Sequence, residues 1–491
     1  MPVHLGAMPL SVATTLRELG PLSPGDIAIL NDPYAGGTHL PDITLMAPVH
    51  ADHHARLLGY VAARAHHSDV GGSSPGSMPL ANEIYQEGLR IPPLLLSEGG
   101  SRNRAVLRLI LANVRTPEER EGDLDAQQAA LYSGAKRLRK IADRRGEDAM
   151  LQAMEALLTY GDRLLRAGLA LVPDGRYEAE SAMEDDGFGS GPVPIRLSLE
   201  IAGGEVLADF SGSAAQTRGG INAVEAITTA ATRYVVRCVA EDLLGTPLPA
   251  GGGAMEALSL ELPEASVVNA APPASVAAGN VETSQRITDV LLLAFAQALP
   301  DRVPALSQGT MNNITVGGRD ERTGHPFTYY ETIGGGIGAG PDRAGLSGVH
   351  SHMTNSLNTP IEALEHAYPL RVLRHSLRTG SGGSGRHAGG DGIARDLLFL
   401  CDAEVTLLSE RRKEGPPGMA GGGAGAPGED VLTSHGETRS LPGKGSLRVK
   451  AGDVLGVRTP GGGGWGPAPS REGLGTTPGG SHESEPGTKS P

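Results

Sequence analysis

The stretch IAILNDPYAGGTHLPD, residues 27–42, sets the pattern for the first part of this 491-residue chain. Its first four residues are apolar and precede Asn-Asp-Pro, which is typical of a buried strand that ends in a turn. A glycine pair then leads to His39 and, three residues later, to Asp42. Glycine adopts backbone dihedrals that other residues avoid, and Pro41 disfavours a helix for the residue before it. The stretch therefore predicts a strand followed by a loop that brings polar side chains close together.

The same histidine–aspartate spacing recurs in AHHSDVGG, residues 65–72, directly after an apolar run at 57–62 that predicts a second strand. Imidazole nitrogen and carboxylate oxygen suit a divalent metal such as Zn²⁺ or Mn²⁺. One such motif is most simply a histidine hydrogen-bonded to a nearby aspartate, and two copies beside glycines strengthen the case for a metal site without making it the leading interpretation. His67 could replace His66 as the ligand, and Asp69 could orient a ligating imidazole.

Other polar residues have simpler interpretations. Asp32 fits a turn residue, although it lies close enough in sequence to join the metal site. His352 and Asn355 follow a glycine-rich run and are candidates for contacting a substrate amide or carboxylate. Thr359 is expected to cap a short helix that contains Glu362.

The middle of the chain is helical in pattern. Thr-Pro-Glu-Glu at 116–119 is a capping box with proline in the first turn, and two amphipathic runs follow before Pro-Asp-Gly at 173–175. We expect a helical hairpin or long helical arm near 116–170. Beyond it, the patterns predict a strand hairpin at 195–210, helices at about 222–244 and 283–299, and short strands at 397–400 and 405–408.

The predicted fold is α+β, mixed and multi-layered, with antiparallel sheets and a glycine-rich β region towards the C-terminus. Residues 1–115 would form the His/Asp metal-site region and 116–172 the helical arm. Residues 173–467 would form a mixed α/β core region with glycine-rich loops. Residues 468–491 are rich in Gly, Ser, Thr, Pro and Glu and are expected to be a disordered tail, because they bury too little apolar surface.

Composition excludes several classes of protein. A formal net charge of −14 argues against nucleic acid or an anionic membrane as the main partner. Only Cys238 and Cys401 are present, so a disulfide framework or a thiolate metal site is not expected. The longest apolar run, 290–299, is short of the ~20 residues of a spanning helix, and the first residues lack the pattern of a secretory signal. We expect a reduced, cytoplasmic protein.

The glycine clusters do not form a recognised phosphate loop. No G-x-x-x-x-G-K-[ST] motif is present, and the run at 334–338 is interpreted as a tight turn. The chain also lacks the G-x-S-x-G elbow of a serine hydrolase.

Further motifs follow in order along the chain: GDI (25–27), QEGLRIPP (86–93), DFSGS (209–213), GNVETSQR (279–286), HMTN (352–355), GGDG (389–392) and TPGGGGWG (459–466). Together with the two His/Asp stretches, they resemble the hydantoinase B/oxoprolinase family over about residues 1–466.

The resemblance implies a B-type subunit of an ATP-dependent cyclic-amide hydrolase. Members of that family convert 5-oxoproline to glutamate, a reaction of glutathione metabolism, or open a hydantoin to an N-carbamoyl amino acid. They act with a hydantoinase A-type subunit that binds ATP, in a hetero-oligomer. The resemblance further implies His39, Asp42 and His66 as ligands of a divalent metal (Zn, Mn or similar) that activates water. Asp69 would adjoin them, with His352 and Asn355 as further catalytic candidates.

Two alternatives stay open. Carboxylases of acetone and acetophenone share this module, so the chain could serve a ketone carboxylase instead. We also expect the chain to lack a segment that family members carry before residue 2, which would fit a truncated subunit that only supports assembly.

Overall fold

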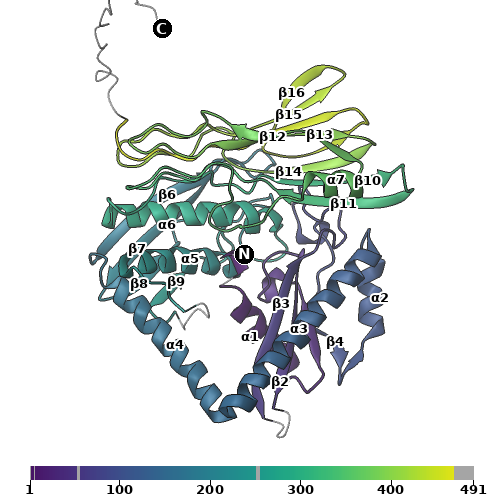
Figure 1. Ribbon diagram of the computed structural model, residues 1–491, viewed down its shortest axis with the longest axis vertical. Coiled ribbons are helices and arrows are strands. Elements are labelled where there is room, and N and C mark those ends of the chain that lie inside the picture. The colour runs from purple at the N-terminus through teal and green to yellow at the C-terminus, as the bar shows by residue number, and fades with distance from the viewer. Residues whose placement is uncertain (1, 5, 52–55, 250–254, 469–491) are drawn as a thin grey trace, which may run out of the picture.

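The computed structural model describes residues 2–4, 6–51, 56–249 and 255–468. Figure 1 shows the predicted mixed α+β architecture: an N-terminal sheet with a long helix across it, a middle layer of helices and a second sheet, and two further sheets stacked above. The sheets are antiparallel except for one parallel strand pair, which confirms the predicted fold class. In the described part of the chain, every helix is too short or too polar to cross a bilayer.

The N-terminal sheet has five strands in the order β3-β2-β1-β4-β5. Strands β1 and β3 are those predicted from the apolar runs before the two His/Asp motifs. Helices α1 (Met8–Leu19) and α2 (Arg104–Ala112) lie beside it. The strands are β1 (Ile27–Leu30), β2 (Asp42–His50), β3 (Leu57–His66), β4 (Leu94–Glu98) and β5 (Ser101–Arg102).

The predicted helical segment consists of α3 (Pro117–Arg145) and α4 (Glu147–Leu169), which meet at Gly146 in the left-handed region at φ +85°. Thr116 occupies the N-cap of α3 as predicted, but its side chain makes no capping hydrogen bond. The two helices diverge as a V in Figure 1, with α3 against β2 and β3 and α4 against α5 of the middle layer. The pair therefore joins two layers of the molecule.

The middle layer contains a four-stranded sheet in the order β6-β7-β8-β9; helix α6 packs on β6 and β7, and helix α5 packs on α6. A π-helical turn, η4 (Gly279–Thr283), leads directly into α6, so residues 279–298 form one continuous helical segment. The predicted strand hairpin and both predicted helices are confirmed. The elements are β6 (Gly175–Met183), β7 (Val193–Ala202), β8 (Glu205–Asp209), β9 (Leu258–Glu261), α5 (Glu225–Leu244) and α6 (Ser284–Ala298).

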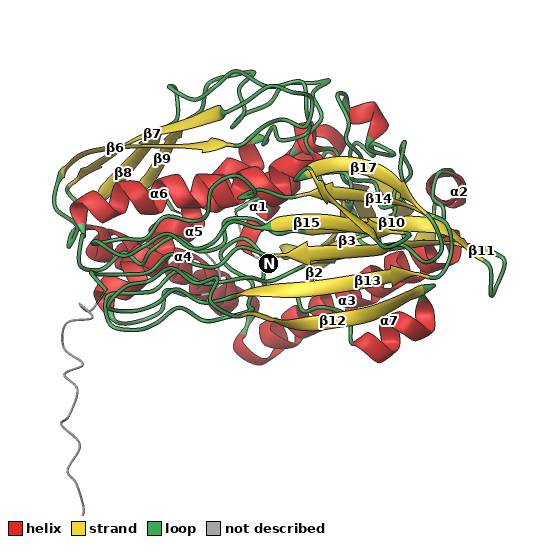
Figure 2. Ribbon diagram, turned by 90° about the horizontal axis from the view of Figure 1, so that it is seen from above, coloured by secondary structure: helices red, strands yellow, loops and turns green. Residues whose placement is uncertain are grey.

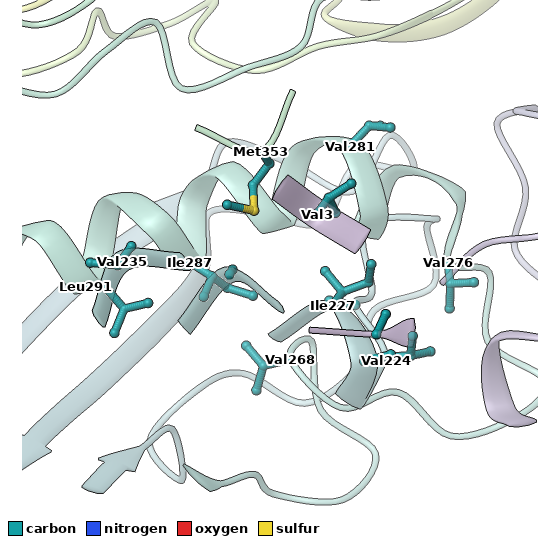
Figure 3. Close-up of a cluster of buried hydrophobic side chains, with 14 of the residues drawn as sticks. Val3, Val224, Ile227, Val235, Val268, Val276, Val281, Ile287, Leu291 and Met353 are labelled. Carbon is teal, nitrogen blue, oxygen red and sulfur yellow. The ribbon is translucent and has the colours of Figure 1, made fainter. Parts of the chain in front are cut away.

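The first turn of the chain, η1 (Pro2–His4), is inserted into the core between these helices. Figure 3 shows Val3 among Ile227, Val281 and Met353, and Val3 is fully buried. Its backbone N–H also donates to the Met353 carbonyl at 3.4 Å. Burial of a valine contributes on the order of 2 kcal/mol, and here it also fixes the position of the neighbouring His4.

The C-terminal part forms a sandwich of two antiparallel sheets, ordered β11-β10-β14-β17 and β12-β13-β18-β15-β16. Val316, Val405 and Leu397 come from both sheets and belong to one buried cluster. The strands are β10 (Asn313–Asp320), β11 (His325–Thr332), β12 (Leu370–Arg378), β13 (Gly392–Phe399), β14 (Ala403–Leu408), β15 (Glu429–Ser434), β16 (Glu437–Leu441), β17 (Lys444–Val449) and β18 (Val454–Arg458). Helix α7 (Ile361–Ala367) is capped by Pro360, one residue after the predicted cap.

The glycine clusters are extended segments packed against one another, visible as long parallel loops in Figures 1 and 2. A Cβ on Gly336 would lie 2.0 Å from the Gly390 oxygen and 2.1 Å from the Gly462 nitrogen. The Gly336 N–H already donates to the Pro460 carbonyl at 3.0 Å. The expected tight turn at 334–338 was therefore wrong: glycine is needed there because backbones approach too closely for any side chain.

One large core contains buried side chains from Val3 to Leu408, from both sides of positions 115 and 172. The division of the chain into regions at these two positions stays a prediction. The tail predicted to be disordered lies outside the described residues from position 469 onwards.

Candidate metal centre

The β2–β3 hairpin brings the two His/Asp motifs together. Asp42 begins β2 and His66 ends β3, and their Cα atoms are direct partners in the antiparallel register. Residues opposite each other on antiparallel strands place their side chains on the same face. The Asp42 Oδ1 accordingly lies 3.3 Å from the His66 Nδ1.

The loop between β1 and β2 supplies His39, whose Nε2 lies 3.2 Å from the second oxygen of Asp42, Oδ2. The path of this loop depends on Gly37, because a Cβ there would lie 2.6 Å from the Asp32 carbonyl oxygen. Asn31 stabilises the loop by donating to the Leu40 carbonyl at 2.8 Å. The glycine pair thus allows the close approach that the sequence suggested.

His39, Asp42 and His66 form a compact group that could hold a metal ion. One ligand atom from each lies within 4.8 Å of the other two. The two rings are 5.1 Å apart, and His39 and Asp42 are essentially inaccessible to solvent. Burial lowers the pKa of His66, which leaves this imidazole neutral at physiological pH. Burial opposes ionisation of Asp42, but its histidine neighbours outweigh burial and hold the pKa of the carboxyl well below its usual range.

A fourth polar group beside the cluster, His4, was missed by the sequence analysis. Its Nδ1 lies 3.6 Å from the Asp42 Oδ2 and has no hydrogen-bond partner among the described residues. Burial lowers the pKa of His4 to about 4, so it too is neutral at pH 7. The nearby sequence gives no metal-ligand spacing, and only the insertion of Val3 into the core brings His4 to this place.

Three more side chains complete the surroundings. Thr38 donates its hydroxyl proton to Asp42 at 2.7 Å, and the Asn280 Nδ2 lies 3.0 Å from the His39 Nε2. Tyr330 of β11 stacks on the His66 ring at 4.5 Å. Asn280 belongs to the GNVETSQR motif, which was a usable signal, whereas no pattern marked Tyr330.

Two other residues that the sequence offered for the metal site lie away from this group. His67 is fully buried and turns towards α3, where its Nε2 lies 2.9 Å from the Gln127 Oε1. The structure therefore brings His66, and not His67, to Asp42. Asp32 accepts from the Tyr34 N–H at 3.0 Å and faces Arg90, as expected of a turn residue.

Asp69 does not join the cluster either. Its carboxylate accepts backbone N–H groups of Gly71, Gly76 and Arg115 at 3.0–3.2 Å, and the Arg115 guanidinium at 2.9 Å. These contacts stabilise the glycine-rich loop after His66. Asp69 was expected beside the metal ligands. The backbone turns away after β3 and places its carboxylate in this loop instead.

His352 and Asn355 are not brought to the cluster. The His352 Nδ1 lies 3.4 Å from the Tyr234 hydroxyl, and His352 lines a separate cavity of about 560 Å³. Asn355 is exposed to solvent.

The donor set fits a divalent metal. Two imidazole nitrogens and a carboxylate oxygen are ligands that Zn²⁺ and Mn²⁺ accept, and His66 and Asp42 are in the protonation states that binding requires. The Asn280 Oδ1 and the His4 Nδ1 are buried without a hydrogen-bond partner among the described residues. Unpartnered buried polar atoms are costly, so their presence beside the cluster is consistent with a ligand there.

The chain belongs to the hydantoinase B/oxoprolinase family, because the model of that family matches residues 1–468. An uncharacterised protein of Methanocaldococcus jannaschii is 40% identical over 95% of this chain and 81% of its own length. The 5-oxoprolinase 1 of Arabidopsis thaliana is 37% identical over 95% of this chain but only 37% of its own length. The chain thus spans little more than a third of that enzyme.

Two solved structures are similar. An ATP-dependent caprolactamase from Pseudomonas jessenii superimposes with a TM-score of 0.84 at 28% identity, over 95% of this chain and 82% of that chain. A nucleotide-free acetone carboxylase gives a TM-score of 0.82 at 18% identity, over 94% of this chain and 68% of the other, which shows a likeness of fold alone.

Proposed function

We propose that this chain is the B-type subunit of an ATP-dependent enzyme that hydrolyses the C–N bond of a cyclic amide. It would act in the cytoplasm, in a hetero-oligomer with an A-type subunit that binds the ATP. The His39, Asp42 and His66 cluster carries the proposal, since it is a largely buried donor set that could hold a metal ion. A divalent metal bound there would supply Lewis-acid activation of water.

The relatives support a cyclic amide as the substrate. Caprolactam and 5-oxoproline, named in two of them, are both lactams. A Pseudomonas protein named as the B-type component of a D-/L-hydantoinase is 29% identical over 91% of this chain and 77% of its own length. The caprolactamase likeness also exceeds that to acetone carboxylase in sequence identity, at 28% against 18%. In the proposed reaction, water adds to the amide carbon, the ring nitrogen leaves with a proton, and a carboxylate is formed.

The chain's own residues would position the reacting groups. Asp42 contacts both imidazoles and fixes their orientation, and the Thr38 hydroxyl in turn fixes one oxygen of Asp42. Tyr330 covers one face of the His66 ring and limits access of solvent from that side. The Asn280 amide, with a free Oδ1, is suited to orient a substrate amide by hydrogen bonding.

The test is co-expression of the full chain with an A-type partner, followed by assays with ATP on 5-oxoproline, hydantoin, caprolactam and acetone. We expect ATP-dependent opening of at least one ring. His66→Ala should abolish it, whereas His67→Ala, the adjacent histidine on Gln127, should retain it.

The alternatives give different results. Consumption of acetone without ring opening would replace the proposal by a ketone carboxylase function. A complex that assembles, binds no metal and acts on none of the four compounds would indicate a non-catalytic assembly role.

A further inference from the structure

A second buried polar cluster lies beside a cavity that shares no residue with the metal centre. The cavity has a volume of about 860 Å³ and lies between the end of β6, helix α6 and the loop 411–424. Two arginines line it, Arg286 of α6 and Arg411, which directly follows the buried Glu410. The Arg286 side chain is 1% exposed and that of Arg411 is 10% exposed.

Most hydrogen-bonding capacity of these two side chains is unused. A guanidinium carries five N–H donors. Within the described part of the chain, Arg411 donates only to the Asp289 Oδ2, at 2.8 Å, and Arg286 donates to the same oxygen at 3.0 Å and to the Glu410 Oε2 at 3.4 Å. Both Nε atoms are buried without a partner among the described residues. Unpaired buried donors on a charged group are expensive, so a water, an ion or a ligand that accepts from them is stabilised there.

The cations of the cluster share their carboxylates. Two guanidiniums share one oxygen of Asp289, while Glu410 is also paired with Lys444, which is 2% exposed. Burial, followed by the neighbouring Arg286, lowers the pKa of Arg411, as expected for a buried cation held near another. Glu282 adds no compensating charge at pH 7, because burial raises its pKa to about 8. Three cations therefore face three carboxylates: Asp289, Glu410 and Asp185, which lies 3.8 Å from the Lys444 Nζ.

The other residues that line the cavity indicate which kind of anion would fit there. Part of the wall is apolar, with Met183, Leu293 and Leu306 among its residues. Exposed Glu180 and Glu414 also line the cavity, together with exposed Lys413, and the whole chain has a formal charge of −14. Acidic groups and a strongly negative protein repel polyanions such as nucleotides more than a monoanion. The lining fits a small molecule with an aliphatic body and one carboxylate.

We propose that this cavity is a second ligand site, in which Arg286 and Arg411 bind the carboxylate of a small aliphatic acid. Planar guanidinium donors match a carboxylate through paired hydrogen bonds, and the low local dielectric strengthens them. The site is independent of the proposed reaction, because none of its residues belongs to the metal centre. Arg286 nevertheless lies six residues after Asn280 on the same continuous helical segment.

The test is calorimetric titration of the full chain, treated with a chelator so that carboxylates cannot bind at the metal centre. Hexanoate and 6-aminohexanoate are the probes, and inorganic phosphate represents the other source of an oxyanion. We expect saturable binding of a carboxylate probe and weaker binding of phosphate. Arg411→Gln should weaken the carboxylate affinity by about ten-fold or more.

Two further variants separate binding from folding. Ala182→Phe narrows the cavity without changing any charge and should also weaken binding. Arg176→Gln, which removes an exposed arginine in a different cavity, should leave affinity unchanged. The proposal is overturned if the wild type binds neither carboxylate, if phosphate binds more tightly, or if Arg411→Gln and Ala182→Phe both bind like the wild type.

Discussion

Asp42 and Glu410 are both completely buried carboxylates, and their surroundings are opposite in character. Asp42 is surrounded by imidazoles, of which His4 and His66 have pKa values lowered by burial and are uncharged at pH 7. Glu410 contacts two permanent cations, Arg286 and Lys444. The carboxylate of the first cluster therefore lies among side chains that can be neutral donors, and that of the second among permanent cations. Burial of a carboxylate alone does not identify a ligand; its neighbours do, because neutral imidazole nitrogens suit a metal cation and guanidinium N–H groups without partners suit a carboxylate.

The largest effect expected is on catalysis, from Asp42→Ala. Removing the residue that contacts both imidazoles should eliminate metal binding and lower the ATP-dependent activity by about 10³-fold, equivalent to several kcal/mol of barrier. Asp32→Asn, a buried turn carboxylate on the same loop, is the control and should retain metal. Equal loss in both variants would contradict a specific role for Asp42.

The next effect is on stability, from Lys444→Met. Removing one partner of a buried ion pair leaves Glu410 under-compensated and should cost about 4 kcal/mol of unfolding free energy, measured by denaturant titration. Lys450→Met breaks an exposed ion pair with Asp402 and should change stability little. A small loss in Lys444→Met would show that Arg286 alone is enough to compensate the charge of Glu410.

Glu87 sharpens the comparison, because it is a buried carboxylate whose partners are all neutral: the Ser275 hydroxyl and two backbone N–H groups. Burial raises its pKa from 4.5 to about 7. A folded-state pKa above the unfolded value means that protonated Glu87 favours folding. This contribution is fully present below pH 4.5 and is lost as the pH rises through 7.

Glu87→Gln removes that dependence. Relative to the wild type, the variant should gain up to about 3 kcal/mol of stability between pH 4.5 and pH 8. Unfolding measured across this range checks the sign. Parallel stability curves for the two proteins would be incompatible with the raised pKa.

The smallest effect is expected from Asp69→Asn. Because this carboxylate is bonded to Arg115 and to backbone N–H groups, the substitution should cost about 2 kcal/mol of stability and leave metal content unchanged. Loss of metal without loss of stability would return Asp69 to the metal centre, where the sequence suggested it.

The local patterns predicted the secondary structure well. The apolar run at 27–30, the proline and acidic residues at 117–119 and the alternation at 195–201 all correspond to observed elements. These signals are local, because they depend on side-chain periodicity and on capping. The glycine run at 334–338 was misjudged as a turn because its cause is not local: distant backbones at Gly390 and Gly462 exclude a side chain there.

The candidate metal centre was predictable only in part. His39, Asp42 and His66 were found because spacing and family resemblance coincide in two short motifs. Their partners Asn280 and Tyr330 come from far along the chain, and His4 depends on the packing of Val3. Asp69 shared the motif spacing, yet the turn after β3 carries it away from His66, and no sequence pattern records that turn.

Metal content tests the account most directly. The full chain, purified without chelator together with its A-type partner, should contain about one divalent metal ion per B-type chain by elemental mass spectrometry, and Asp42→Ala should contain almost none. A folded wild-type complex without stoichiometric metal, or an Asp42→Ala complex that keeps it, would contradict the assignment of this cluster.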